Sequence, residues 1–126
     1  MAEETTNTTN ELNDSILKTI REMIAPAEDY TYFDTDLIIH INTCMSILHQ
    51  LGLKSYKITG ETETWADYLG DRIDLEHVKS YIYFKIKTMF DPPQSSFVLD
   101  AYKKEADKLE WYINAVVDPS EVGADV

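Results

Sequence analysis

Two long stretches of the chain place apolar residues at three- and four-residue steps, the spacing of a buried helical face. The first covers residues 75–90 and the second residues 96–117. Between them, Pro92 and Pro93 force the residues before them out of helical geometry, and Ser95 or Ser96 offers a capping oxygen. The pattern predicts an antiparallel helical hairpin against which the upstream chain packs. The predicted buried positions are Leu75, Val78, Ile82, Ile86 and Met89, then Val98, Tyr102, Ala106, Leu109, Ile113 and Val116.

Several aromatic residues of this hairpin lie outside the two apolar stripes, and a domain of this size cannot easily bury all of them. They are Tyr81, Tyr83 and Phe84 in the first helix and Phe97, Trp111 and Tyr112 in the second. Two interpretations remain open. Either the other helices wrap these rings, or some of the rings contact a neighbouring subunit, since aromatic side chains are enriched in interface cores.

Two further helices are expected upstream of the hairpin. The first begins at Asn13 or Asp14 and covers DSILKTIREMIA. The second opens at Asp34 or Thr35 and runs to Gly52, because glycine takes the left-handed conformation that ends a helix without penalty. Their predicted core positions are Ile16, Leu17, Ile20, Met23 and Ile24, then Leu37, Ile38, Ile41, Cys44, Met45, Leu48 and Leu51.

Two features of this region indicate contacts beyond the chain's own core. Ile39 and Ile47 lie on the side of the second helix opposite its core face. Residues 54–59 read as an extended piece in which Tyr56 and Ile58 alternate with polar neighbours. One strand cannot satisfy its own hydrogen bonds, so we expect either a small hairpin or addition to a strand of another chain.

A short helix follows in ETWADYLG, with Trp65, Leu69 and, with less support from the pattern, Tyr68 turned inward. The predicted fold class is therefore all-α. We expect a bundle of about four helices with a short extended or hairpin insertion between the second and third main helices.

The 126 residues are enough for one domain with a core of its own. Residues 1–11 are polar and acidic and are expected to be disordered, residues 12–116 form the helical domain, and residues 117–126 form a flexible acidic tail. The amino-terminal stretch lacks the hydrophobic segment of a secretory signal, and no apolar run reaches membrane length. We therefore expect a soluble protein in a reducing, cytoplasmic setting, without a membrane partner.

The formal net charge is −12, from 23 acidic and 11 basic residues. Gripping nucleic acid requires clustered lysine and arginine to replace phosphate counterions, so this balance argues against DNA or RNA binding. It does not argue against DNA passing nearby, because an acidic surface repels phosphate and lets a duplex slide.

The search for catalytic and metal-binding chemistry is negative. The single cysteine, Cys44, excludes an internal disulfide and any multi-cysteine metal site. His40, Cys44 and His49 share one helix and cannot all converge on a tetrahedral ion. Paired acids such as Asp34 and Asp36, or Asp71 and Asp74, read as solvated faces or caps rather than acid–base pairs. Nucleotide-binding, nucleophile-elbow and zinc-protease motifs are missing, so we expect no catalytic residue, cofactor or metal, and no enzyme.

The order of these segments resembles a known family. A helix opens at Asp34-Thr35-Asp36-Leu37 and ends at Leu51-Gly52, and a short extended insert and a long aromatic helix follow. After the break Phe90-Asp91-Pro92-Pro93 comes a last helix with Asp107, Leu109, Trp111 and Asn114. Over residues 13–116 the pattern is similar to that of the small head–tail connector proteins of long-tailed phages and prophages, also called head-completion or adaptor proteins.

The resemblance implies an all-helical protein that assembles into a ring, commonly of about twelve subunits. Such a ring would lie between the portal protein and a stopper or tail-completion protein, at the virion neck, after assembly in the host cytoplasm. Double-stranded DNA would pass through its lumen without specific binding. The resemblance also implies that residues 117–126 could dock onto the portal. The residues expected at subunit or partner interfaces are Ile39, Ile47, Tyr56, Ile58, Tyr81, Phe84, Phe97, Trp111 and Tyr112.

The alternative is an acidic regulatory protein-binding module or a DNA mimic. Mimicry requires acids spaced along one face like phosphates, and here lysines interrupt them. The interrupting residues are Lys79, Lys85, Lys87, Lys103, Lys104 and Lys108.

Overall fold

The structure is a computed structural model that describes residues 12–24, 33–70, 75–90 and 92–117. Its helices are α2 (Ile16–Ile24), α3 (Asp34–Gln50), α4 (Trp65–Leu69), α5 (Leu75–Phe90) and α6 (Ser96–Val117). The predicted all-α class is confirmed, and the described ranges contain no β-strand. The expected tails are residues 1–11 and 117–126. Val117 is the last residue of α6, and the other residues of both tails lie outside the described residues.

Local sequence signals account for where the main helices begin and end. Asp34 and Asp36 lie in the first turn of α3, where carboxylates interact favourably with the helix dipole. Gly52, just past the end of α3, has a φ of 122°, a conformation that side chains with a Cβ rarely adopt. At the start of α6, the Ser95 hydroxyl accepts a hydrogen bond from the Val98 N–H at 3.3 Å, so Ser95 caps this helix.

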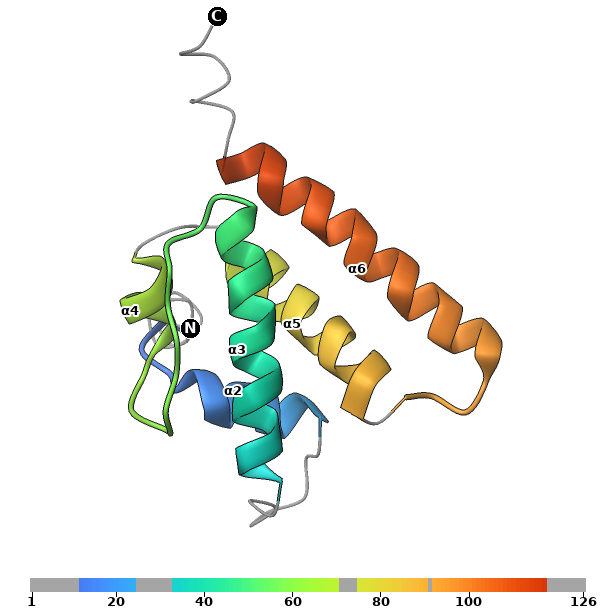
Figure 1. The fold of residues 1–126 in the computed structure, drawn as a ribbon, viewed down its shortest axis with the longest axis horizontal. Coiled ribbons are helices and arrows are strands. Elements are labelled where there is room, and N and C mark those ends of the chain that lie inside the picture. The colour runs from blue at the N-terminus through green and yellow to red at the C-terminus, as the bar shows by residue number, and fades with distance from the viewer. Residues whose placement is uncertain (1–11, 25–32, 71–74, 91, 118–126) are drawn as a thin grey trace, which may run out of the picture.

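Helix α5 lies at the centre of the molecule. It packs antiparallel to α6 as the predicted hairpin and also contacts α2 and α3 (Figure 1). The core fills the space between these helices, and α4 closes one side of it through Trp65, Tyr68 and Leu69. Helix α6 lies at the edge of the molecule, with α5 on one side only (Figure 1). Among the described helices, none covers the opposite face of α6.

The segment between α3 and α4 does not form the predicted strand or hairpin. Ile58 has the strand-like hydrogen bonding that the sequence suggested, but its partner is a side chain. The Asn42 amide on α3 donates to the Ile58 carbonyl oxygen at 3.0 Å and accepts from the Ile58 N–H at 2.8 Å. One amide thus satisfies both backbone groups of Ile58, and the segment needs no partner strand at this position.

Two sets of contacts tie α4 and its preceding loop to α2. The Ile16 N–H donates to the Glu63 carbonyl oxygen at 3.0 Å, and the Trp65 N–H donates to the Asp14 carbonyl oxygen at 3.2 Å. Arg21 on α2 forms a bidentate pair with Asp34, at 3.0 and 2.8 Å, and also binds Glu61. Arg21 therefore connects α2, the start of α3 and the loop before α4.

The predicted apolar stripes are correct in their phase but not at their ends. Met23 and Met89 were expected in the core and are exposed instead. Both lie in the last turns of their helices, α2 and α5, where no other described element covers them. Val116 is outside the residues whose side chains the structure describes.

Candidate interaction surface

The outward side of α6 carries the most exposed aromatic residues among the described side chains. Phe97 is 82% exposed, Trp111 68% and Tyr112 41%. Phe97 and Trp111 are fourteen residues apart, about 21 Å along the helix. Exposing large rings to water is unfavourable, so this face has the character of a contact surface.

Other exposed apolar side chains lie on different helices. Ile39 on α3 is 58% exposed, Met89 at the end of α5 is 46% exposed, and Met23 on α2 is 36% exposed. These side chains are distributed over four helices once α6 is included. A single flat interface on α6 does not account for all of them.

The nine residues predicted at interfaces fall into three groups. Four are exposed, namely Ile39, Phe97, Trp111 and Tyr112. Three are half-buried and pack against the core, namely Ile47, Tyr56 and Phe84. Two are buried in the chain's own core, namely Ile58 and Tyr81, so the structure corrects the expectation that these two reach a partner. The sequence analysis missed Met23 and Met89, and only their places at helix ends could have indicated them.

Tyr81 is buried because α6 supplies a polar partner for its hydroxyl. The Tyr81 hydroxyl donates to Glu110 at 2.7 Å, and the Lys85 ammonium lies 3.8 Å from the same carboxylate and 6.0 Å from the centre of the Tyr81 ring. Burial, together with the hydrogen bond to Glu110, raises the pKa of Tyr81 above its usual value. A position off the apolar stripe of α5 thus becomes part of the core between α5 and α6.

Phe84 and Tyr56 also contact aromatic rings of this chain. Phe84 packs edge-on against Tyr102 of α6, with ring centres 5.1 Å apart. Tyr56 stacks on Tyr68 of α4 at 5.1 Å, and its hydroxyl donates to Asp67 at 3.1 Å. The wrapping interpretation therefore holds for these rings, whereas Phe97 and Trp111 project into solvent.

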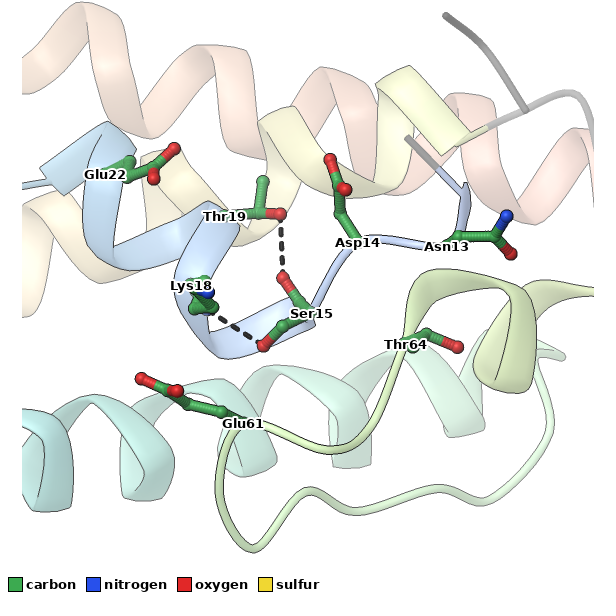
Figure 2. Close-up of a pocket in the computed structure, with 8 residues that line it drawn as sticks. All are labelled: Asn13, Asp14, Ser15, Lys18, Thr19, Glu22, Glu61 and Thr64. Carbon is green, nitrogen blue, oxygen red and sulfur yellow. Dashed lines mark hydrogen bonds between the residues drawn. The ribbon is translucent and has the colours of Figure 1, made fainter. Parts of the chain in front are cut away.

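A polar pocket of about 460 Å³ lies between the start of α2 and the loop before α4 (Figure 2). Its lining includes the carboxylates of Asp14, Glu22 and Glu61 and the Lys18 side chain. The side chains of Asp14 and Glu22 are exposed, and Glu61 is already bound to Arg21. Acid–base catalysis uses a desolvated acid beside a differently placed base, and these exposed groups do not form such a pair.

The three residues weighed as metal ligands have separate surroundings. Cys44 is buried, and burial raises the pKa of its thiol to about 12. The His49 Nδ1 lies 2.9 Å from the Leu53 carbonyl oxygen, and the His40 ring packs edge-on against Phe90. The described part of the chain holds no group of three His, Cys, Asp or Glu side chains placed to bind a metal ion. Asp71 and Asp74 lie outside the described residues.

None of the helices in the described ranges is both long and apolar enough to cross a membrane.

Comparison with known proteins assigns a family to this arrangement. No curated protein and no solved structure matched the chain. The family model described as phage connector protein matches residues 16–120, which includes all five described helices. The chain therefore belongs to the phage connector protein family and is a structural connector of the phage virion.

Proposed function

We propose that this connector assembles into a ring of about twelve copies between the portal and a stopper or tail-completion protein. The observation that carries the proposal is the distribution of exposed apolar side chains over α2, α3, α5 and α6. A subunit of a closed ring contacts two neighbours through different faces and meets further proteins above and below. Several separated apolar positions suit such a subunit better than one binding patch does.

The role requires no covalent chemistry, and the surface described above is consistent with that. The pocket between α2 and the loop before α4 is polar, and its carboxylates are exposed or bound to arginine. We infer that the work of the protein lies in its contacts, with Ile39, Phe97, Trp111 and Tyr112 at subunit or partner interfaces. Ile47, Tyr56 and Phe84 would contribute only at the margins of these interfaces, because they are half-buried.

The charge of the chain supports a channel through which DNA moves. A net charge of −12 repels the phosphate backbone, so a duplex in the lumen would not be held by the wall. Residues 117–126 include Asp118, Glu121 and Asp125 and no basic residue, and we propose that this segment docks onto the portal. The place of action would be the virion neck, reached after assembly in the host cytoplasm.

The test is native mass spectrometry of the purified chain, alone and together with the portal protein encoded beside it. A closed assembly near a dozen copies, alone or on the portal, is the expected result. A chain that stays monomeric or dimeric and ignores the portal would overturn the proposal. That outcome would instead favour an acidic regulatory binding protein. Deleting residues 117–126 should preserve helicity and weaken portal binding, and unchanged affinity would refute the docking role of this segment.

A further inference from the structure

The outward face of α6 has a regular pattern that its exposed rings alone do not reveal. Its residues recur at alternating steps of four and three, the spacing of a coiled-coil seam. They are Phe97, Ala101, Lys104, Lys108, Trp111 and Ala115, and all six are exposed. The opposite face of α6, with Ala106, Leu109 and Ile113, is buried against the rest of the chain. The helix thus has two seams, one facing the core and one facing outward.

The sizes along the outward seam are complementary to the same sizes read in the opposite direction. From one end they run large, small, lysine, lysine, large, small. When two such helices are placed side by side in opposite directions, Phe97 faces Ala115 of the other copy, and Trp111 faces Ala101. Each large ring then meets a methyl group, which lets the helices approach and fills the space between them.

The charges beside the seam match in the same arrangement. The two central layers place Lys104 of one copy opposite Lys108 of the other. Asp107 and Glu105 flank these lysines on the two sides of the seam. Within one chain Lys108 already lies 3.5 Å from Glu105. In the antiparallel pair, four lysines meet four carboxylates, so the middle of the contact is charge-balanced even though the whole chain is strongly acidic.

We propose that α6 is a self-association surface, through which two copies of this chain pair antiparallel along the seam from Phe97 to Ala115. A parallel pair fits the same residues less well. It would place ring against ring and alanine against alanine and leave voids, whereas lysines meet in the two central layers of either arrangement. The occupant of this face is therefore a second copy related by a twofold axis near the middle of α6.

This pairing does not rest on the proposed ring. A twofold contact uses the same patch on both copies and stops at two, whereas a ring requires head-to-tail contacts through different patches. Ile39 on α3 lies outside the seam and stays available in the pair. Because the pair covers Phe97 and Trp111, these two residues would contact a ring neighbour or another partner only when the pair is open. The two contacts are nevertheless distinguished by their products, a dimer or a closed ring.

The first experiment uses disulfide cross-linking in the full-length protein, with Lys104→Cys and Lys108→Cys prepared separately. One variant carries a tag, so that the mixed dimer is resolved from the two homodimers on a non-reducing gel. The proposal predicts that the mixture cross-links strongly and that each variant alone cross-links weakly. In the pair, residue 104 of one copy lies directly opposite residue 108 of the other. Residue 104 of one copy and residue 104 of the other are instead offset by about 6 Å along the helix axis, as are the two residues 108. The wild-type chain is the control for Cys44, which is buried.

The second experiment measures association by analytical ultracentrifugation. The double variant Phe97→Ala, Trp111→Ala should weaken the dimer at least about tenfold while keeping the helical circular dichroism signal. Ile39→Ala is the matched control on another helix and should leave the dimer unchanged. Lys104→Leu should tighten the dimer, because a charged seam residue lowers the stability of a coiled coil.

Three results would overturn the pairing. They are strong cross-linking of each single variant with itself, no cross-linking in the mixture, or equal association of the Phe97, Trp111 double variant and the wild type. None of these results bears on portal binding. Conversely, a dimer with the expected cross-links that ignores the portal would leave the pairing intact and refute the proposed ring.

Discussion

The two tryptophans of this chain lie in regions that differ in how far they bury this side chain. Trp65 on α4 is fully buried, and its indole N–H donates to the Thr19 hydroxyl at 3.1 Å. Trp111 on α6 is largely exposed and packs edge-on against Tyr112, with ring centres 5.5 Å apart. The first region includes the loop from residue 53 to 64, which Asn42 and the Tyr56–Tyr68 stack hold against α3 and α4.

The difference shows that the presence of an aromatic residue in a helix does not by itself indicate whether its side chain is buried or exposed. Helix α4 is only five residues long, too short to be stable through its own hydrogen bonds alone, and it also has contacts with α2. Helix α6 has 22 residues and a buried face of its own, so its outer face is not needed for folding. We therefore expect Trp65 to contribute to stability and Trp111 to contribute to association.

The largest effect is expected for Trp65→Ala. Removing a fully buried tryptophan leaves a cavity and removes the hydrogen bond to the Thr19 hydroxyl, which keeps its own bond to the Ser15 carbonyl oxygen. Such changes typically cost about 3–5 kcal/mol. Urea denaturation followed by circular dichroism measures the loss in the free energy of unfolding. A loss below about 1 kcal/mol would show that α4 is not part of the cooperative core.

A smaller loss is expected for Asn42→Ala, which removes both hydrogen bonds to Ile58. Leaving a buried N–H and a carbonyl group without partners costs about 1–3 kcal/mol. Asn42→Asp keeps the acceptor for the Ile58 N–H but places a carboxylate oxygen against the Ile58 carbonyl oxygen, where the amide nitrogen donated. The same denaturation experiment should rank the wild type above both variants. If both variants matched the wild type, the Asn42 amide would not be what holds this segment in place.

The third prediction concerns alkaline pH on the Trp65 side. Burial, and then the hydrogen bond to Asp67, raise the pKa of Tyr56 from its usual value near 10 to about 12. The folded state thus keeps a proton that the unfolded chain loses first. This contribution to stability is fully present below pH 10 and is lost as the pH rises from 10 to 12.

Tyr56→Phe removes this titration and provides the measurement. Between pH 10 and 12 its unfolding free energy should fall less steeply than that of the wild type. The difference should be about 1 kcal/mol or less, because Tyr56 is partly open to solvent. Equal slopes for the two proteins would mean that Tyr56 titrates normally in the folded chain.

The smallest effect on stability is expected for Trp111→Ala. Measured at protein concentrations low enough to keep the chain monomeric, the free energy of unfolding should change by no more than about 0.5 kcal/mol. At higher concentration the same variant should associate more weakly than the wild type. A loss comparable to that of Trp65→Ala in the monomer would erase the contrast between the two regions and place Trp111 in the core.

Much of the architecture could be read from the sequence, because it depends on local chemistry. The acids at the start of α3, the glycine at position 52, the two prolines after α5 and the serine before α6 act on their own neighbours. The apolar period likewise set the phase of each helix, and Trp65 and Leu69 were correctly expected to face inward. The order of these signals was also sufficient for the resemblance to phage connectors, which the family match confirms.

The tertiary structure decided how many sides of each helix are covered, which no helical period encodes. Tyr81 lies off the apolar stripe of α5 but is buried, since Glu110 of α6 reaches its hydroxyl. The strand predicted around Ile58 does not form, because Asn42, sixteen residues earlier, makes the hydrogen bonds to the backbone N–H and carbonyl oxygen of Ile58. Met23 and Met89 fit the period but are exposed at helix ends. A side chain's own sequence neighbours fix its direction on the helix, whereas its burial depends on which distant element lies opposite.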